Sequence, residues 1–361
     1  MHIKLRNLVN LNKRLCGLQT QDTPEIVNPW MKRSLAMFAF AYHQYGPPDV
    51  LRKVEYPDPQ PKPDEVLVKV YATTVSSGDW RARSLSMPDG LGWLGRLVFG
   101  VRKPRKPVLG TEFSGVIEQV GTKVTGFKIG DAVIGFPGAR FGAHAEYITM
   151  RAAGNLVMKP DTIPFEIAAA IPFGGTTAYD FLVNKGTLRA GETVLVNGAS
   201  GAVGSACVQI AHHIGAHVTA VCSASNAEMV RQLGADRVID YQTQDFTAEG
   251  ALYDMVVDAV GSAPWVRTQH ALKRGGRMLL VAGNASDMFF GGLKARLRGK
   301  KLIGGVASER RDILKTVVDL AEAGAFSPVI DRCYAFDDTP LAHALVDSRR
   351  KKGNVVVSVV S

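Results

Sequence analysis

The sequence predicts a two-domain α/β protein, in which a β-rich domain is followed by a domain built on a doubly wound parallel sheet. Three observations carry this prediction: the length of 361 residues, a change in hydrophobic pattern near residue 160, and a glycine-rich turn after residue 197. A chain of this length is too long for one small core. We expect residues 34–160 to form the first domain and residues 161–304 the second, with residues 305–361 returning to the first.

The composition is that of an ordinary globular protein. Hydrophobic residues make up 46% of the chain and charged residues 21%, and no apolar run approaches the roughly 18 residues that a membrane span requires. We therefore expect a soluble, cytoplasmic protein with no membrane partner. The formal charge of +10 falls to +6 without residues 1–34. No nucleic-acid-binding signature accompanies this mild excess, so no nucleic-acid partner is expected.

The first 33 residues form a basic extension that differs from the rest of the chain. Four basic residues precede the first acidic one, Asp22, and Pro24 and Pro29 interrupt any regular structure. A basic, acid-poor start is typical of an organelle-targeting presequence. A disordered tail, or an upstream start codon with the true chain beginning near Met31, accounts for the same composition. The sequence leaves these alternatives open.

Short strands broken by turns are expected from residue 34 to about residue 158. Glu65–Val75 alternates apolar and polar residues, as a strand with one buried face does. Phe113–Val120 and 131–136 are two further strands, joined by glycine turns. Four prolines between residues 57 and 63 indicate an extended connector. The pattern predicts a compact, barrel-like β domain.

Strands and helices alternate after about residue 161. Five apolar runs rich in β-branched residues predict strands at 193–197, 217–222, 237–241, 255–260 and 277–283. Helical stretches such as 202–214 and 226–233 separate most of them. This alternation predicts a parallel sheet with both faces covered. Beyond it we expect helices at 313–323 and 341–348 and a closing strand at 354–360 that completes the first domain.

The strongest chemical signal is the glycine-rich turn between the first of these strands and the helix 202–214. Gly198 permits a tight turn, Gly201 lets the backbone approach a pyrophosphate, and Gly204 lets the helix pack closely on the strand. Free N–H groups at the helix start would face the phosphates. The pattern predicts a dinucleotide-binding Rossmann domain. The cofactor contacts expected from the loop and the strand ends are Gly198, Ala199, Ser200, Gly201, Ala202, Val203, Gly204, Val260 and Gly283.

The end of the next strand favours NADPH over NADH. An acidic residue there would hydrogen-bond the adenosine ribose of NAD and repel the 2′-phosphate of NADP. No acid occurs between His217 and Glu228, and Ser223, Ser225 and Asn226 can donate to a phosphate. We therefore expect NADPH as the cofactor, with NADH as the weaker ligand.

Several motifs occur in a fixed order from about Ser34 to Ser361. Residues 121–133 have glycine, valine, phenylalanine and Gly-Asp at regular spacing, residues 110–115 read GTEFSG, and residues 200–204 and 233–241 carry the cofactor-half patterns. Together they resemble the medium-chain dehydrogenase/reductase superfamily, in its zinc-free quinone oxidoreductase-like branch. The resemblance implies a GroES-like fold for the β-rich domain and an active site at the C-terminal ends of the parallel strands. It also implies a homodimer in which edge strands of two Rossmann sheets pair.

The positions that hold catalytic zinc in relatives carry other residue types here. The resemblance places Ser76, Thr111 and Phe173 where zinc enzymes have a Cys, a His, and a Cys or Asp. These side chains cannot form a zinc site of thiolate and imidazole ligands. The four cysteines also contain no CxxC pair. We therefore expect no zinc and no other metal.

The resemblance also supplies candidate active-site residues. The segment 76–81 looks like the loop that borders the nicotinamide in zinc-free relatives, which makes Ser76, Ser77 and Asp79 weak catalytic candidates. A capping role for Asp79, at a helix beginning near Trp80, is the alternative. Thr177 lies where the family's linker crosses the cofactor, although a plain helix start explains it nearly as well.

Three further features have two interpretations each. Tyr241 either lies near the adenosine or is a buried tyrosine at a strand end. His144 is expected to form a wall of the substrate cleft rather than a metal site. The segment 83–105, with several large apolar residues, supplies either an apolar lid or a partner-binding surface.

The absence of zinc ligands decides the expected reaction. Oxidising a simple alcohol benefits from a Lewis acid that stabilises the alkoxide. Hydride addition to an enone or a quinone instead spreads the developing charge to a carbonyl oxygen, which hydroxyl and N–H donors can stabilise. We expect an NADPH-dependent reductase of a small conjugated carbonyl. A non-catalytic NADPH-binding sensor or interaction protein is the alternative.

Overall fold

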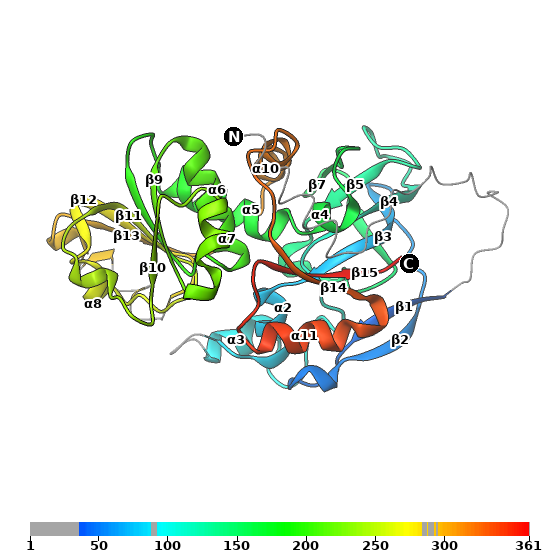
Figure 1. The fold of residues 1–361 in the computed structure, drawn as a ribbon. Helices are drawn as coiled ribbons and strands as arrows, with labels where there is room; N and C mark the ends of the chain where they lie inside the picture. The colour runs from blue at the N-terminus through cyan, green and yellow to red at the C-terminus, as the bar shows by residue number, and fades with distance from the viewer. Residues whose placement is uncertain (1–35, 88–91, 284–286, 288–291, 294, 361) are drawn as a thin grey trace.

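A computed structural model describes residues 36–87, 92–283, 287, 292–293 and 295–360. The basic extension, residues 1–33, lies outside the described residues. The described chain forms two lobes, one built on an antiparallel-rich sheet and the other on a parallel sheet (Figure 1). No helix in these ranges is long and apolar enough to cross a membrane.

The first lobe has the predicted β-rich, GroES-like fold. Its main sheet has the order β14-β15-β3-β4-β5-β7, with β6 also paired to β3. These strands are β3 (Glu65–Val75), β4 (Phe113–Val120), β5 (Ala132–Gly135), β6 (Tyr147–Arg151), β7 (Leu156–Met158), β14 (Ile330–Ala335) and β15 (Asn354–Ser358). β1 (Ala36–Ala41) and β2 (Arg52–Pro57) form a separate antiparallel ribbon. Because β15 pairs antiparallel with β3, the C-terminal segment closes this lobe.

The central strand β3 is buried on both faces, which corrects the expectation of one solvent-facing side. Val66, Val68 and Val70 point into the core of the β lobe. The other face is covered by α4 (Phe165–Ala169), where the Tyr71 and Phe165 rings stack with centroids 4.4 Å apart. The alternation of residue types therefore did not mark the strand's exposed side.

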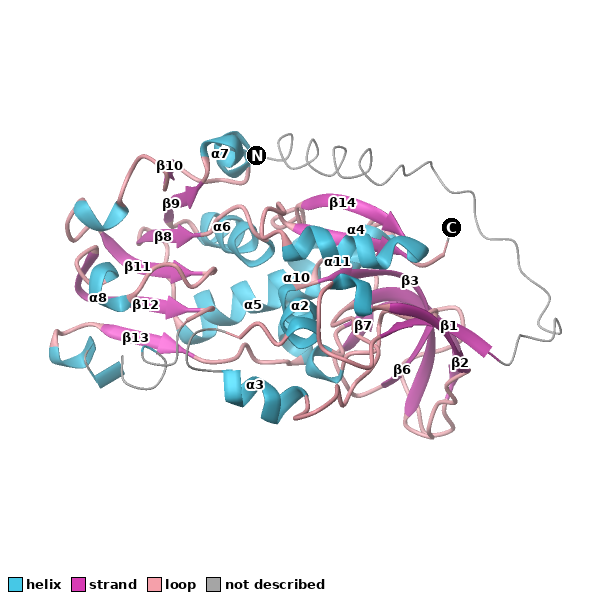
Figure 2. Ribbon diagram, turned by 90° about the horizontal axis from the view of Figure 1, so that it is seen from below, coloured by secondary structure: helices cyan, strands magenta, loops and turns pink. Residues whose placement is uncertain are grey.

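The second lobe is the predicted Rossmann sheet, with the order β10-β9-β8-β11-β12-β13 and all strands parallel (Figure 2). The strands are β8 (Thr193–Asn197), β9 (His217–Cys222), β10 (Arg237–Asp240), β11 (Tyr253–Asp258), β12 (Leu272–Leu280) and β13 (Lys301–Gly304). The five predicted strands are present. The sixth, β13, was not predicted, because it is a four-residue, half-exposed strand at the sheet edge.

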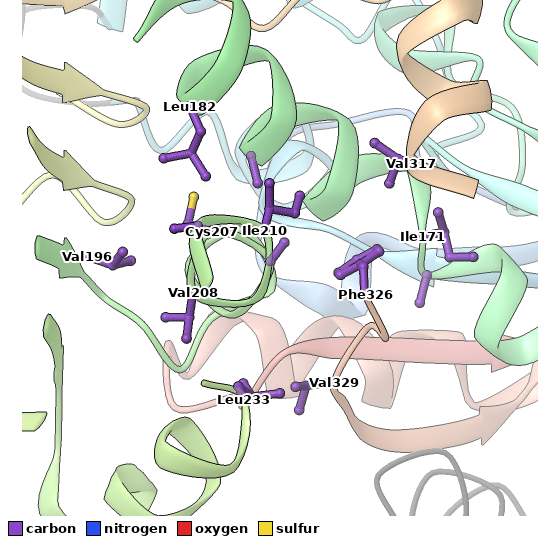
Figure 3. Close-up of a cluster of buried hydrophobic side chains, with 14 of the residues drawn as sticks. Ile171, Leu182, Val196, Cys207, Val208, Ile210, Leu233, Val317, Phe326 and Val329 are labelled. Atoms are coloured by element: carbon purple, nitrogen blue, oxygen red, sulfur yellow. The ribbon is translucent and has the colours of Figure 1, made fainter. Parts of the chain in front are cut away.

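Helices cover both faces of the parallel sheet, lie between the lobes and pack on the β lobe. They are α2 (Ser77–Ser84), α3 (Gly92–Phe99), α5 (Pro172–Tyr179), α6 (Ala202–Ile214), α7 (Ala227–Gln232), α8 (Trp265–Thr268), α10 (Arg311–Glu322) and α11 (Thr339–Asp347). Figure 3 shows part of the largest core, in which Val317 of α10 and Phe326 lie between Ile210 of α6 and Ile171. This shared core fixes α5 and α6 beside the β lobe. We propose domain boundaries near residues 160 and 304.

Candidate functional site

The glycine-rich turn joins β8 to α6 in a tight conformation. Gly198 has φ +80°, a left-handed conformation that favours glycine. The N–H groups of Gly198 and Ala199 both donate to the Val221 carbonyl, at 3.1 and 3.0 Å. A Cβ on Gly204 would lie 2.1 Å from the Gly198 oxygen, so only glycine allows the helix to start this close to the turn. The strand, turn and helix therefore have the geometry of a dinucleotide loop.

The start of α6 is open for a phosphate. A Cβ on Gly201 would have its nearest neighbour at 3.5 Å, which leaves room for a ligand at the backbone. No side chain caps the helix, and the first N–H groups of an α-helix have no intrahelical acceptor. The C-terminal segment supports the loop from the other side, because Gly353 N–H donates to Ser200 O at 2.8 Å. These features fit a pyrophosphate.

The ends of the neighbouring strands border this loop. Asp258, at the end of β11, accepts hydrogen bonds from the Val260, Gly261 and Ala263 N–H groups, at 3.2, 2.9 and 2.9 Å. Its carboxylate also accepts from Asn197 Nδ2 at 3.0 Å. Asp258 thereby shapes the turn that carries the half-exposed Val260. Gly283 lies just after β12, on the same edge of the sheet.

The predicted 2′-phosphate residues lie together after β9. Ser223 Oγ and Ser225 Oγ are 3.1 Å apart, and Asn226 Nδ2 donates to Ser223 Oγ at 3.1 Å. Tyr241 follows β10, the neighbour of β9, and is 60% exposed. The alternative of a buried strand-end tyrosine is therefore wrong. The cluster presents hydroxyl and amide donors with no carboxylate among them.

The segment 76–79 forms the start of α2 in the β lobe. Asp79 is fully buried, and its Oδ2 accepts from the Ser76 N–H at 2.8 Å and from Ser76 Oγ at 2.6 Å. The Asp79 N–H in turn donates to Ser76 Oγ at 3.2 Å, which completes a capping box. Ser76 is therefore the N-cap, and the helix begins at Ser77 rather than near Trp80. Asp79 therefore does take part in capping α2, but from the third position of the helix rather than as the N-cap.

Asp79 also links the start of α2 to the chain segment that precedes β4. Its Oδ1 accepts from Gly110 N–H at 2.8 Å, and Thr111 Oγ1 donates to Ser76 Oγ at 3.2 Å. The chain segments around residues 76 and 110 are thus held together by one buried carboxylate. No sequence pattern indicated this contact, because its partners are 31 residues apart.

The three positions matched to zinc ligands come together at Gly78. A Cβ on Gly78 would lie 3.3 Å from Ser76 Oγ, 3.6 Å from Thr111 Cγ2 and 3.7 Å from Phe173 Cε2. The donor set there is two hydroxyls and a phenyl ring. Thr177 lies on the same helix as Phe173, α5, and is nearly buried. It occupies the sixth position of that helix, so a plain helix start does not explain it.

The comparisons with known proteins match both lobes. Residues 62–161 match the alcohol dehydrogenase GroES-like domain, and residues 233–357 match a domain described as zinc-binding dehydrogenase. The chain is 30% identical, over 339 residues, to a chloroplastic quinone-oxidoreductase homolog of Spinacia oleracea. That match covers 89% of this chain and 98% of the relative. The chain belongs to the medium-chain dehydrogenase/reductase superfamily. Within it, the chain falls in the quinone oxidoreductase-like branch.

Two further matches bear on this medium-chain reductase. It is 30% identical over 333 residues to a chloroplastic NADPH-dependent alkenal/one oxidoreductase of Arabidopsis thaliana, covering 89% of this chain and 79% of the relative. The structure of the quinone oxidoreductase from Coxiella burnetii superposes with a TM-score of 0.79 at 26% identity, over 90% of this chain and all of that one. The protein is an oxidoreductase with a nicotinamide cofactor and a small-molecule substrate.

Glu112 is a buried ionisable residue of this reductase that the sequence analysis did not single out. Thr74 Oγ1 donates to its Oε1, and the Phe173 N–H donates to its Oε2 at 2.5 Å. Burial raises the pKa of Glu112 to about 8, and the nearby Asp79 carboxylate acts in the same direction. The available signal was its position in GTEFSG, where an acid directly precedes the three buried residues that begin β4.

Lys351 is a cation that interacts electrostatically with Glu112. Burial lowers the pKa of Lys351 to about 8, against the opposing influence of Asp331 and Glu112. Its Nζ donates to the carbonyl of Gly353, the residue just before β15, whose N–H donates to Ser200 O in the glycine-rich turn. A buried acid of the β lobe and a cation of the C-terminal segment thus lie close to the candidate site.

His144 does not line a cleft, which corrects the prediction for it. Its side chain is fully buried, with Nε2 3.0 Å from the Thr74 carbonyl and its ring 5.3 Å from that of His343. His343 accepts from Arg83 Nε at 3.3 Å. The two histidines therefore belong to the interior packing of the β lobe. Among the described residues, His, Cys, Asp and Glu form no group of three that could hold a metal ion.

Proposed function

We propose that this reductase is zinc-independent and uses NADPH to reduce a small conjugated carbonyl compound, a quinone or an enone or enal. The observation that carries the proposal is the meeting of Ser76, Thr111 and Phe173 at Gly78. Their side chains supply neither thiolate nor imidazole, so they do not suit Zn²⁺. A conjugated acceptor needs hydrogen-bond donors rather than a Lewis acid for its developing negative charge.

The residues that would hold the cofactor follow from the loop geometry. The turn at Gly198 and Gly201, with the uncapped start of α6, suits the pyrophosphate. Ser223, Ser225 and Asn226 suit the 2′-phosphate, since they are hydrogen-bond donors and the cluster itself contains no carboxylate. When bound, the nicotinamide supplies the hydride. The names of the relatives support a nicotinamide cofactor, and the preference for NADPH rests on this donor cluster.

The hydrogen bonds assign different tasks to the candidate catalytic residues. The Ser76 proton is directed at Asp79, and the Thr111 proton is directed at Ser76. Ser76 and Asp79 therefore act as positioning residues that hold the start of α2. Ser77, at the first position of α2, and Thr177, on α5, are the hydroxyls we assign to the carbonyl oxygen, with water or a side chain supplying the proton.

We propose that the enzyme is a homodimer joined through the Rossmann sheet. β13 is an edge strand, and an unpaired edge invites pairing with another chain. Leu293 and Leu297, shortly before β13, are 71% and 81% exposed. An isologous contact across two β13 strands would cover both features.

We propose the cytoplasm as the location, with import into an organelle through residues 1–33 as the alternative. The Spinacia oleracea relative is named as a chloroplastic protein. Microscopy of the full chain, and of the chain started at Met31, each fused to a fluorescent protein, distinguishes the two. Equal cytoplasmic distribution supports the first, and loss of an organelle signal on truncation supports the second.

A coupled binding and turnover experiment tests the function. The purified chain is titrated with NADPH and NADH by fluorescence, then mixed with NADPH and a panel of enones, quinones and simple aldehydes. We expect tighter binding of NADPH and loss of nicotinamide absorbance with conjugated acceptors only. Equal affinity for the two cofactors would contradict the assignment of Ser223, Ser225 and Asn226 to the 2′-phosphate. NADPH binding with no turnover across the panel would favour the sensor or interaction protein.

A further inference from the structure

Helix α3 and the residues after it carry an apolar surface on the outside of the β lobe. Trp93, Leu97, Val98 and Val101 are 65%, 55%, 54% and 59% exposed. In Figures 1 and 2, α3 lies at the lower border of the molecule, on the side of the β lobe that faces the parallel-sheet lobe. The reductase site does not use these four residues. Four large apolar side chains facing water on one short segment mark an interaction surface.

The inner side of this segment is firmly attached. Gly95 is buried, Phe99 packs near Phe141 with ring centroids 6.3 Å apart, and Tyr45 Oη donates to the Gly100 carbonyl at 2.8 Å. The Arg105 N–H donates to the Phe99 carbonyl at 2.9 Å. The outer side chains are therefore held outward by a fixed backbone.

Charge identifies the kind of surface that the segment fits. Between residues 92 and 111 there are five basic residues and no acidic one. The basic residues are all exposed: Arg96, Arg102, Lys103, Arg105 and Lys106. None of them forms an ion pair with a carboxylate among the described residues. Apolar side chains with a tryptophan, bordered by unpaired cations, are the composition of helices that lie in the interface of an anionic membrane.

We propose that α3 and the segment to Lys106 dock this enzyme on an anionic lipid surface. Trp93 and Leu97 enter the headgroup region, and the cations bind lipid phosphates. This peripheral contact requires no spanning helix. The proposal revises the expectation that the protein has no membrane partner. Of the two interpretations of residues 83–105, it favours a partner-binding surface over an apolar lid. The proposal does not depend on the reductase function.

Vesicle sedimentation tests the proposal on the full-length protein. Phosphatidylcholine vesicles with and without phosphatidylglycerol are compared, at low and raised salt. We expect binding only with the anionic lipid, weakened by salt. Trp93→Ser/Leu97→Ser and Lys103→Glu/Arg105→Glu should each weaken partitioning about tenfold or more. Circular dichroism checks that each variant is folded.

Matched controls distinguish binding through α3 from nonspecific effects of net charge and of exposed apolar side chains. Lys123→Glu/Lys128→Glu makes the same change in net charge, and Val266→Ser removes an apolar side chain that is 66% exposed on α8. Both should bind vesicles as the unmodified chain does. Any binding by residues 1–35 is shared by all variants and does not distinguish them. In the unmodified chain, brominated lipid should quench a fluorescence component that Trp93→Phe abolishes.

Four results would overturn the proposal. The unmodified chain fails to bind anionic vesicles, or the α3 variants bind as well as the controls. Alternatively, the α3 variants change the mass in light scattering while vesicle binding stays absent, in which case the surface contacts a second copy. If the α3 variants instead have a raised KM for the acceptor and no form of the protein binds vesicles, residues 83–105 act as an apolar lid.

Discussion

At the scale of single residues, the buried carboxylates organise the candidate site. Asp79 accepts three hydrogen bonds from two separate segments, and Glu112 accepts two from Thr74 and Phe173. Buried acids are costly unless such donors compensate them. These contacts join α2, β3, α5 and the segment just before β4, at the positions that the resemblance matches to the zinc ligands of relatives.

Replacing Asp79 with Asn should destabilise the fold. One acceptor oxygen becomes a donor that faces either Gly110 N–H or the Ser76 donors, so a buried hydrogen bond is lost. We expect a loss of about 1–3 kcal/mol in the free energy of unfolding. Urea denaturation measures it, with the exposed Asp161→Asn as the control, expected within about 0.5 kcal/mol of the parent chain. An equal, small effect of both substitutions would show that the Asp79 network contributes little.

Glu112 should make stability decrease as the pH rises. Burial raises its folded-state pKa from an ordinary 4.5 to about 8, so the folded chain keeps a proton that the unfolded chain releases. The stability it contributes is complete below about pH 4.5 and is lost as pH approaches 8, at up to about 1.4 kcal/mol per pH unit.

Comparison with Glu112→Gln isolates this effect. Glutamine does not titrate, and any lost hydrogen bond adds an offset that is independent of pH. The difference in unfolding free energy, parent minus variant, should therefore fall between pH 5 and pH 8. Parallel stability curves for the two proteins would contradict the raised pKa.

Whether the sequence predicted a residue's role depended on how local its partners are. The roles of Gly198 and Gly204 were predictable, because turn and helix packing are set by adjacent residues. The network of Asp79 and the burial of His144 were not, since their partners Gly110, Thr74 and His343 lie far away in the chain.

At the scale of elements, buried segments were predictable and edge segments were not. β8, β9 and α6 have the predicted bounds, because each is an apolar or amphipathic run. β13 and β14 were missed. Both lie at sheet edges, where polar side chains such as those of Lys301 and Arg332 replace the apolar pattern.

The glycine loop allows a contrast between fold and binding. Gly201→Ala places a methyl group 3.5 Å from its nearest neighbour, so stability should change by less than about 1 kcal/mol while binding of NADPH and NADH weakens at least about tenfold. Gly204→Ala places it 2.1 Å from the Gly198 oxygen and should destabilise the fold itself. Calorimetric titration and urea denaturation separate the two outcomes. Unchanged cofactor binding by a folded Gly201→Val variant would show that the glycine-rich turn is not part of the cofactor site.

At the scale of the whole molecule, the three proposed functions involve different elements. The glycine loop contributes to the core that the two lobes share, α3 lies at the lower border on the side facing the parallel-sheet lobe, and β13 forms an edge of the parallel sheet (Figure 1). Cofactor binding, dimer formation and membrane contact can therefore be changed separately.

Dimer formation should depend on the β13 edge. Light scattering of the parent chain should give twice the monomer mass, and Ile303→Lys, which puts a charge on the edge strand, should shift the protein toward monomer. The surface variant Val266→Ser serves as the control and should remain dimeric. A monomer mass for the parent chain at all concentrations would contradict the proposed pairing.

The most direct test of the central claim follows the hydride itself. The enzyme is freed of metal by chelation, checked by elemental analysis, and incubated with NADPH that carries deuterium at the transferred position and with a simple enone. The account predicts one deuterium at the β-carbon of the reduced product, at a rate that the removal of metal does not change. Activity that disappears with zinc and returns on its addition would contradict the account, and so would an enone left unlabelled by an enzyme that binds NADPH.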